Sequence, residues 1–247
     1  MKTTKDAVLY GEIMIHQPVG GPRVSVDTIL LAAYAGIKKN ERALELGSAH
    51  GAVSLLLAKR YPGAGAIEGL EKQEELVELA RRNAAENGFS GMPVFTAGDL
   101  RNIRDIYSPQ SFQVVVMNPP YDERGKSRLS PDPREAVARQ GVHCTLEDVA
   151  RATKYVLANK GRFYLVMRAT RLAETCAVLV QAGLQPKRVR PVYPKPAREA
   201  AVFLMKAVRA GGTGMVLEPP LFVEDAEGNF TPDLLRAYRI GDSLCRW

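Results

Sequence analysis

The segment Asn118-Pro119-Pro120-Tyr121 combines an amide, two prolines and an aromatic ring, a combination suited to holding a planar amine. The Asn118 side chain and the Pro119 carbonyl can both accept hydrogen bonds. Two acceptors facing one NH2 group would hold both hydrogens and direct the nitrogen lone pair at an electrophile. Tyr121 offers a flat ring that can stack on the group carrying the amine. The segment therefore predicts a catalytic amine site; alternatively, it is a proline-kinked turn capped by Asn118.

The residues before this segment predict its place in the fold. Residues 112–117 are β-branched and almost uniformly apolar, which is typical of a strand buried on both faces of a parallel sheet. Prolines cannot continue a central strand, so the chain must leave the sheet at Asn118. Ligands of open α/β sheets bind outside the carboxyl ends of the strands, and this is where the segment falls.

A second pattern, strand–glycine turn–helix, occupies residues 42–60. Residues 42–46 predict a strand, residues 47–51 (Gly-Ser-Ala-His-Gly) a turn, and residues 52–60 a helix. This is the arrangement that cradles nucleotides, because glycines admit a close backbone approach and the helix offers free N–H groups. Glu45 precedes the turn, and its carboxylate suits an ammonium or sulfonium group better than a pyrophosphate. His50 is expected to be a loop side chain rather than a catalytic base.

Two further acids follow the next two predicted strands. Glu71 ends the strand of residues 65–70, about 20 residues past the turn, the spacing at which a carboxylate meets a ribose hydroxyl. Alternatively, Glu71 is an acidic first-turn residue of the following helix. Asp99 could accept a hydrogen bond from an adenine amine, or it could cap the next helix. Glu45, Glu71 and Asp99 would meet at one edge of the sheet.

The remaining chain alternates between helices and strands. The pattern predicts a hairpin or irregular entry (7–26), a helix from Asp27 as N-cap to 34, a helix (73–87), a strand (92–96), a helix (145–159), a strand (161–167), a helix (171–182), a closing strand pair (185–192 and 200–206) and a Gly- and Pro-rich tail from 210.

Composition and charge limit the class of protein. The chain has 247 residues, of which 46% are hydrophobic and 25% charged, as in soluble globular domains. It lacks an apolar run long enough to cross a membrane and an apolar N-terminal segment typical of a signal peptide, so a cytoplasmic protein without a membrane partner is expected. The three cysteines, Cys144, Cys176 and Cys245, are scattered, which predicts free thiols and no metal site. The net charge of +7 favours an acidic partner such as nucleic acid.

Two groups of basic residues are candidates for binding phosphates. Residues 122–144 form a long polar segment next to the amine motif, and a loop of this length is usually functional or mobile; its alternative is a solvated loop. The second group lies around the closing strand pair. The candidates are Arg124, Lys126, Arg128, Arg134 and Arg139 in the first group, and Lys187, Arg188, Arg190, Lys195 and Arg198 in the second.

Taken together, these motifs resemble the class I S-adenosylmethionine-dependent methyltransferases of the amino-methylating branch. Residues 8–207 resemble the bacterial tRNA (adenine-N6) methyltransferases, which modify the adenine beside the anticodon of a valine tRNA. The Asn-Pro-Pro-Tyr motif is shared with DNA adenine, ribosomal RNA guanine and release-factor glutamine methylases. It therefore indicates the reaction class more firmly than the substrate.

The resemblance implies an α/β fold of the Rossmann-like class I type. The expected sheet has seven mostly parallel strands, helices on both faces and an antiparallel last strand. Residues 1–40 would form an entry segment and helix, residues 41–208 the core domain, and residues 209–247 a C-terminal extension. The cofactor would be S-adenosylmethionine and the partner RNA, most directly tRNA, with direct in-line transfer that needs neither a metal nor a covalent intermediate.

The resemblance also implies roles for single residues. Glu71 would hold the ribose hydroxyls, and Asp99, with Leu100 beside it, the adenine amine. Ala49 stands where the turn usually has a glycine, and Lys72 stands where a hydrophobic residue usually covers the adenine. The expected cofactor-binding residues are Asp27, Glu45, Gly47, Ser48, Ala49, Gly51, Glu71, Lys72, Asp99, Leu100 and Asn118; the expected catalytic residues are Asn118, Pro119 and Tyr121.

The motifs leave three candidate functions. The first is N6-methylation of an RNA adenine, with another RNA or DNA base as a variant. The second is methylation of a protein glutamine; proteins of that type carry a helical domain before the glycine turn, and only about 45 residues precede it here. The third is a non-catalytic binding module, which the intact amine motif and cofactor acids disfavour.

Overall fold

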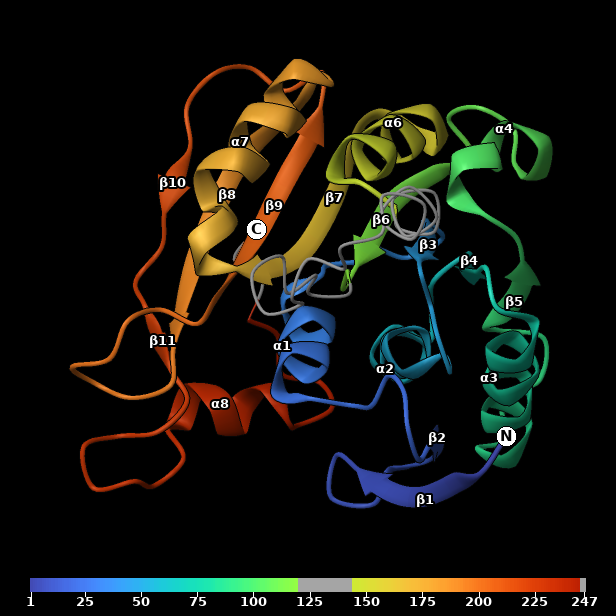
Figure 1. Cartoon of the computed structure of the whole chain (residues 1–247), viewed down its shortest axis with the longest axis horizontal. Coiled ribbons are helices and arrows are strands. Elements are labelled where there is room, and N and C mark those ends of the chain that lie inside the picture. The colour runs from blue at the N-terminus through green and yellow to red at the C-terminus, as the bar shows by residue number, and fades with distance from the viewer. Residues whose placement is uncertain (120–143, 245–247) are drawn as a thin grey trace, which may run out of the picture.

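Parallel strands form the centre of the molecule, as the computed structural model shows for residues 1–119 and 144–244 (Figure 1). In spatial order the strands are β5 (Val94–Ala97), β4 (Ala66–Glu71), β3 (Arg42–Leu46), β6 (Phe112–Met117), β7 (Leu157–Arg168), β9 (Val202–Arg209) and β8 (Leu184–Tyr193). Four neighbouring pairs, β5–β4, β4–β3, β3–β6 and β6–β7, are parallel, whereas β9 is antiparallel to both β7 and β8. The prediction of seven mostly parallel strands with an antiparallel last strand is confirmed.

The sheet of the described residues also gains two short strands that the sequence did not predict. The C-terminal tail runs along the outer edge of β8, where β10 (Val216–Leu217) and β11 (Leu221–Phe222) each pair with β8 in parallel. The tail therefore covers a sheet edge that would otherwise present unpaired backbone groups.

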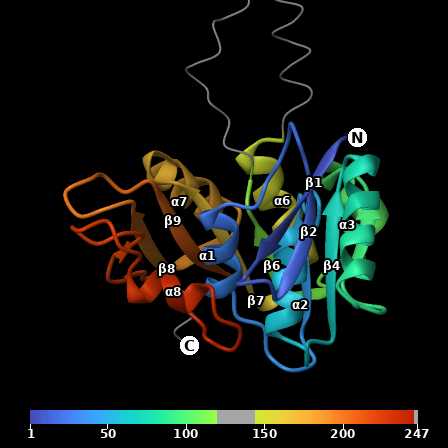
Figure 2. The ribbon, with the colours of Figure 1, turned by 90° about the horizontal axis from the view of Figure 1, so that it is seen from below.

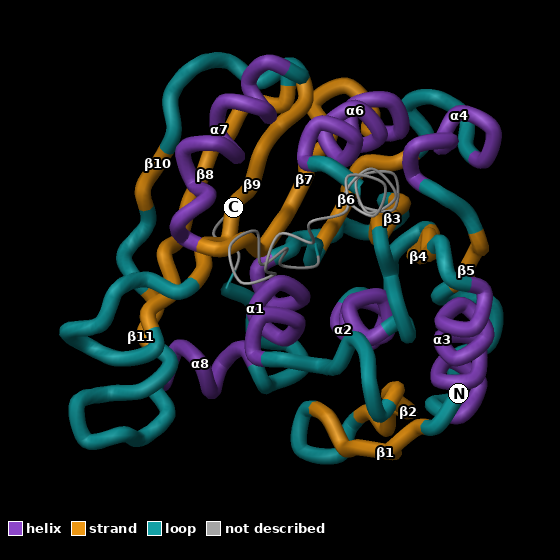
Figure 3. The backbone as a smooth tube through the Cα atoms, viewed as in Figure 1, coloured by secondary structure: helices purple, strands orange, loops and turns teal. Residues whose placement is uncertain are grey.

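Helices cover both faces of the sheet (Figure 3). The helices form two sets, one on each face. One apolar cluster packs the first set against its face of the sheet, and a second cluster packs the second set against the opposite face. The first set is α1 (Val26–Tyr34), α2 (Ala52–Arg60), α3 (Glu74–Glu86) and α8 (Pro232–Ala237); the second is α4 (Ile103–Ile106), α6 (Leu146–Val156) and α7 (Leu172–Gln181), with the short helices η1 (Leu100–Asn102) and η2 (Ala169–Arg171) beside them.

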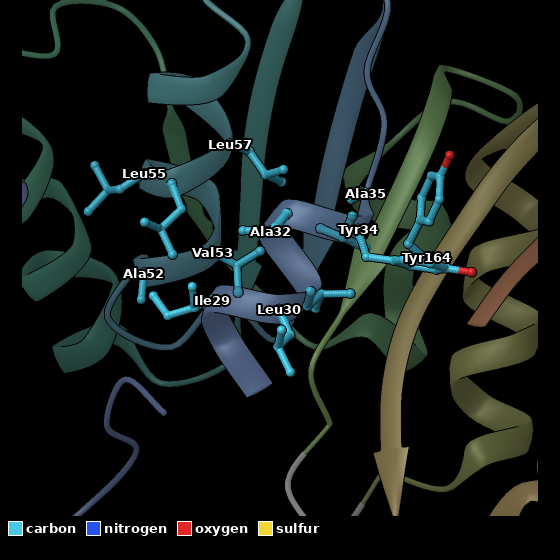
Figure 4. Packing of buried hydrophobic residues seen from close by; sticks show 14 of the residues in the cluster. Ile29, Leu30, Ala32, Tyr34, Ala35, Ala52, Val53, Leu55, Leu57 and Tyr164 are labelled. Atoms are coloured by element: carbon cyan, nitrogen blue, oxygen red, sulfur yellow. The ribbon is translucent and has the colours of Figure 1, made fainter. Parts of the chain in front are cut away.

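The central strand β6 shows why this sequence requires two helical layers. Val114 and Val116 belong to the first cluster and Val115 to the second, and all three are fully buried. Successive side chains of a strand point to opposite faces, so an apolar run needs cover on both sides. Tyr164 of β7 extends the first cluster and meets Tyr34 of α1 edge-on, with ring centroids 6.1 Å apart (Figure 4).

A separate hairpin precedes the sheet. Strands β1 (Thr3–Val8) and β2 (Ile13–Pro18) pair with each other in antiparallel fashion and lie on the outer side of α2 and α3 (Figure 2). Ile13 and Ile15 of β2 are buried in the first apolar cluster. Of the two alternatives predicted for residues 7–26, the hairpin is the one observed, but the predicted bounds were wrong, because the hairpin begins at Thr3 and ends at Pro18.

Several predicted element boundaries were wrong. Asp27 was predicted as the N-cap of α1, but the helix begins at Val26 with Ser25 as N-cap. Asp27 lies in the first helical turn, where its carboxylate interacts favourably with the helix dipole. Helix α6 ends at Val156 rather than at residue 159, because Leu157 already pairs with Phe112 of β6 and enters the core. Sheet pairing and burial override local helix preference here.

The tail from residue 210 packs into the fold. Leu221 and Leu234 are buried in the first cluster. The Arg60 guanidinium on α2 donates to carbonyl oxygens near the end of α8, including that of Asp242 at 2.7 Å. The predicted C-terminal extension covers residues 209–247, and we propose that its described part, residues 209–244, completes the core domain rather than forming an independent unit.

Substitution of Leu221 by Ala tests this proposal. Leu221 is fully buried, so the cavity should lower the free energy of unfolding by about 2–4 kcal/mol. The matched control is Leu217→Ala in the neighbouring strand β10, where the side chain is 67% exposed and the loss should stay within about 0.5 kcal/mol. Denaturant unfolding measures both; equal small losses would show that the tail contributes little to folding.

Candidate active site

The register of the central strands brings the two sequence motifs together. Leu46, the last residue of β3, pairs with Leu70 of β4 on one side and with Met117, the last residue of β6, on the other. The chain then leaves the sheet at Gly47 and at Asn118. The glycine turn and the amine motif therefore begin next to each other, at the carboxyl edge where ligands of such sheets bind.

The turn between β3 and α2 is tightly wound. Gly47, Ala49 and Gly51 have φ angles of +70°, +47° and +86°. The N–H groups of Gly47 and Ser48 both donate to the Leu70 carbonyl, at 2.8 and 3.0 Å. Ala49 thus has a left-handed conformation, although its Cβ makes this conformation unfavourable.

Gly51 is required by packing as well as by its backbone angle. A Cβ at this position would lie 2.7 Å from Cζ of Phe95 on β5 and 3.0 Å from Cβ of Ala80 on α3. The end of the turn is therefore pressed against two neighbouring elements. This contact fixes where helix α2 begins and where its N–H groups point.

Gly51→Ala should lower the free energy of unfolding by about 2–4 kcal/mol, through left-handed strain together with overpacking. Gly88→Ala is the matched control, because Gly88 has a similar φ of +73° but its Cβ would meet nothing within 4 Å. The control should lose only about 1 kcal/mol, from backbone strain alone. Chemical denaturation of both variants checks the difference; similar losses would show that the contact with Phe95 does not constrain the turn.

Glu71 holds the tip of the turn. Its carboxylate accepts from the Ala49 N–H at 3.0 Å through Oε2 and from the Gln73 N–H at 2.9 Å through Oε1. The side chain is buried and lies at the end of β4, as the sequence predicted. An ionised carboxylate has about four acceptor positions, so each oxygen retains acceptor capacity for a ligand hydroxyl.

Glu45 has a structural task that the sequence did not reveal. Helix α2 begins after Gly51, which has no side chain to cap it. Oε2 of Glu45 accepts instead from the N–H of Ser54 at 2.8 Å and from its Oγ at 2.5 Å. The carboxyl group of β3 thus caps the helix that follows the turn, a role usually filled by the N-cap residue itself.

The buried position of Glu45 changes its acidity. Desolvation raises its pKa to about 8, against the lowering effect of its two bonds with Ser54, and the charge of Glu71 raises it further. The folded protein therefore retains a proton that the unfolded chain loses near pH 4.5. Folding stability should fall as the pH rises from about 4.5 to about 8.

Glu45→Gln should remove this pH dependence. Relative to the variant, the wild-type protein should lose on the order of a few kcal/mol of unfolding free energy between about pH 5 and pH 8, in the absence of any ligand. Urea unfolding over a pH series measures this difference. Parallel curves for the two proteins would show that Glu45 is ionised at neutral pH in the folded state.

Asp99 caps the short helix that follows it, which is the second of the two roles predicted for it. Its Oδ1 accepts from the Arg101 N–H at 2.9 Å, which caps η1, and its Oδ2 pairs with the Arg101 guanidinium at 2.6 Å. Lys72 Nζ lies 3.4 Å from the same oxygen. The Arg101 hydrogen bonds, with a smaller contribution from Lys72, hold the pKa of Asp99 well below its ordinary value. Leu100 is buried immediately after it.

The turn also contains two buried polar side chains without partners in the described part of the chain. These are the Ser48 hydroxyl and both ring nitrogens of His50. Burial, with a smaller effect from the nearby charge of Arg23, lowers the pKa of His50 to about 4. The imidazole is therefore neutral at pH 7. Orphaned polar groups of this kind are uncommon in folded proteins and are candidates for contact with a ligand.

Part of the predicted catalytic motif lies within the described residues. Asn118 and Pro119 follow β6 directly and are half-buried. Asp27, also half-buried, lies in the first turn of α1. Tyr121 and the first basic group, Arg124, Lys126, Arg128, Arg134 and Arg139, lie outside the described residues, and their roles remain predictions.

The second basic group is largely engaged within the molecule. Arg188 pairs with the buried Glu218, and Arg190 pairs with Asp233. Lys195 lies 2.7 Å from Glu224, and Lys187 donates to three carbonyl oxygens of residues 212–214. These cations anchor the C-terminal extension, an alternative that sequence reasoning missed because their partners are about 25 to 45 residues away. Arg198 is exposed in the loop after β8.

Two properties expected from the sequence concern metals and membranes. Within residues 1–119 and 144–244, no three His, Cys, Asp or Glu side chains come together as they would around a metal ion. No helix in the same part of the chain is long and apolar enough to cross a membrane.

The parallel sheet, its antiparallel last strand and the acid-flanked turn after β3 define the class I methyltransferase fold. A family model described as a methyltransferase domain matches residues 37–179, more than half of the chain. The chain belongs to this methyltransferase family.

Individual proteins agree with this assignment. A predicted O-methyltransferase of known structure from Agrobacterium tumefaciens superposes with a TM-score of 0.71 at 21% identity, covering 89% of this chain and 99% of that one, and it shows the shared fold. A tRNA1(Val) (adenine(37)-N6)-methyltransferase from Porphyromonas gingivalis is 28% identical over 240 residues, which cover 94% of this chain and 92% of that protein. A protein of the same name from Aeromonas hydrophila is 26% identical over 209 residues, 85% of each chain.

Proposed function

We propose that this chain transfers a methyl group from S-adenosylmethionine to the exocyclic N6 amine of an adenine in tRNA. The observation that carries the proposal is the pairing of Leu46 with Leu70 and Met117, because it starts the cofactor-type turn and the amine motif side by side. The names of the relatives favour the anticodon-loop adenine of valine tRNA as substrate. Such a reaction belongs in the cytoplasm.

The residues around the turn fit the cofactor. S-adenosylmethionine supplies a methyl group on a positively charged sulfur. The turn is wound by Gly47 and Gly51 so that backbone can approach a ligand closely. Glu71 has acceptor capacity left for the ribose hydroxyls, and the unpartnered Ser48 and His50 side chains offer further polar contacts. A cationic group near Glu45 would favour its ionised form.

The adenine end of the cofactor is less simply assigned. Leu100 provides an apolar surface, but the Asp99 carboxylate is already engaged by Arg101 and Lys72. Asp99 can hold the adenine amine only where one of these cations gives way. We therefore give Glu71 the principal role in binding and Asp99 a secondary one.

The amine is held at the end of β6. The Asn118 side chain and the Pro119 carbonyl accept its two hydrogens and leave the nitrogen lone pair directed at the methyl group. Holding the two reacting atoms in contact supplies much of the acceleration. The two acceptors also stabilise the positive charge that develops on nitrogen. Tyr121, by sequence, would stack on the base after it is turned out of the RNA loop.

The RNA would approach the carboxyl edge of the sheet. Strand β8 runs antiparallel to β9, and β9 antiparallel to β7, so β8 has the direction of the core strands. The loop after it, with Lys195 and Arg198, therefore lies at the same edge as Asn118. Of the second basic group, the exposed Arg198 is our candidate for contacting phosphates, whereas Lys195 is paired with Glu224. The net charge of +7 also favours an acidic partner.

Asn118→Ala is the direct test of the chemistry. The variant loses one preorganised acceptor, so methyl transfer to valine tRNA in single-turnover assays should fall by on the order of a hundredfold or more. Cofactor binding, measured by calorimetry, should remain. Gln113→Ala is the control on the same strand, because Gln113 accepts from the Arg42 N–H at the opposite end of β6.

The outcomes separate the alternatives. Near-normal transfer by the Asn118 variant would show that the motif is a proline-kinked turn. Mass spectrometry of the products should detect N6-methyladenosine in tRNA. Methylation of another base or of a protein glutamine by the wild-type enzyme would contradict the assigned substrate while leaving the amine chemistry intact.

A further inference from the structure

Two asparagines on α3 and its C-cap act together as a substitute for a β-strand. Asn87 accepts from the Met14 N–H at 2.8 Å and donates to the Met14 carbonyl at 2.6 Å. Asn83, one helical turn earlier, accepts from the His16 N–H at 2.8 Å and donates to the His16 carbonyl at 3.0 Å. Each side-chain amide thus makes hydrogen bonds to both the N–H and the carbonyl of one β2 residue, as the peptide groups of a neighbouring strand would.

The spacing of the two elements makes this match possible. Side chains four residues apart on a helix are about 5–6 Å apart at Cβ, and strand residues two apart are separated by roughly 6.6 Å. Met14 and His16 are such a pair, and β1 occupies only one edge of β2. The other edge is therefore closed by α3 instead of by a third strand.

Asn83 makes one contact that Asn87 does not. Its second amide hydrogen goes to the His50 carbonyl at 3.0 Å, within the glycine turn. The second hydrogen of Asn87 goes to the Asn83 carbonyl of its own helix, at 2.7 Å. Asn83 is fully buried, and its side-chain amide makes three hydrogen bonds, two as donor and one as acceptor.

The His50 carbonyl lies next to the part of the turn that Glu71 holds. Glu71 binds the Ala49 N–H from the end of β4, and Asn83 binds the His50 carbonyl from α3. Ala49 and His50 lie between these two hydrogen bonds. Ala49 has a left-handed conformation, which is unfavourable for a residue with a Cβ. A turn under this strain relaxes when a restraint is removed, and its backbone groups then change direction.

We propose that Asn83 is a positioning residue for cofactor binding. It couples the N-terminal hairpin to the glycine turn and holds the turn in the conformation that receives S-adenosylmethionine. The inference rests on the proposed function. It assigns a role in cofactor affinity to a helix residue that the active-site motifs do not include.

The experiment compares Asn83→Asp with Asn87→Asp. Each change is nearly isosteric, keeps the acceptor for the β2 N–H and removes the donated hydrogens. Both variants lose a bond between α3 and β2, so both should lower the unfolding temperature. Only Asn83→Asp also loses the bond to the turn.

The Asn83 variant should therefore bind S-adenosylmethionine at least tenfold more weakly by calorimetry. Its KM for the cofactor should rise, while kcat at saturating cofactor and KM for tRNA change by less than about twofold. Cofactor affinity of the Asn87 variant should stay within about twofold of wild type. If the buried Asp prevents folding, Asn83→Ala and Asn87→Ala provide the same comparison.

Equal changes in cofactor affinity for the two positions would overturn the inference, because hairpin anchoring alone would explain them. Unchanged affinity in a folded Asn83 variant would overturn it as well. A wild-type protein that fails to bind S-adenosylmethionine would instead overturn the proposed function, and with it the inference. Unfolding temperatures recorded on the same samples distinguish loss of folding from loss of binding.

Discussion

The structure depends on the restraint of one strained turn, between β3 and α2. Three of its five residues have left-handed backbone angles, and one of these is Ala49. The Leu70 carbonyl holds two N–H groups of this turn, the Glu71 carboxylate holds a third, and the Asn83 amide holds the His50 carbonyl. Because these partners come from β4 and α3, the turn keeps its shape only while the sheet and the helix layer are assembled.

Burial decides how the acids of the site behave. Glu45 lies in the core, caps α2 and has its pKa raised by desolvation, whereas Asp99 lies near the surface and has its pKa lowered by Arg101. Glu45 lies within β3 and Asp99 directly follows β5, with β4 between the two strands, and their surroundings shift the two pKa values in opposite directions. A cationic ligand near Glu45 would reverse the effect of burial, which couples ligand binding to proton loss.

The positive charge of the chain has two separate uses. On β8 it anchors the C-terminal extension, since Arg188 and Arg190 meet carboxylates of that extension. The extension in turn covers the edge of β8 and contributes Leu221 and Leu234 to the core. We propose that exposed cations at the carboxyl edge, such as Arg198, are the ones that contact RNA. Charge density alone therefore overestimates the surface available to a nucleic acid.

The sequence by itself determined the order of the main strands and helices before residue 209, the buried strand before Asn118, the acid at the end of β4 and the glycine turn. These features depend on local periodicity and on residues such as proline and glycine whose backbone preferences act over a few positions. Tertiary structure alone decided that Glu45 caps α2, that Arg101 engages Asp99 in place of a free carboxylate, and that Asn83 joins β2 to the turn. Asn83 is 67 residues from His16 and 33 from His50. Such long-range hydrogen bonds depend on how the helix layer packs on the sheet. A local sequence pattern cannot predict which distant backbone group a buried side chain will contact.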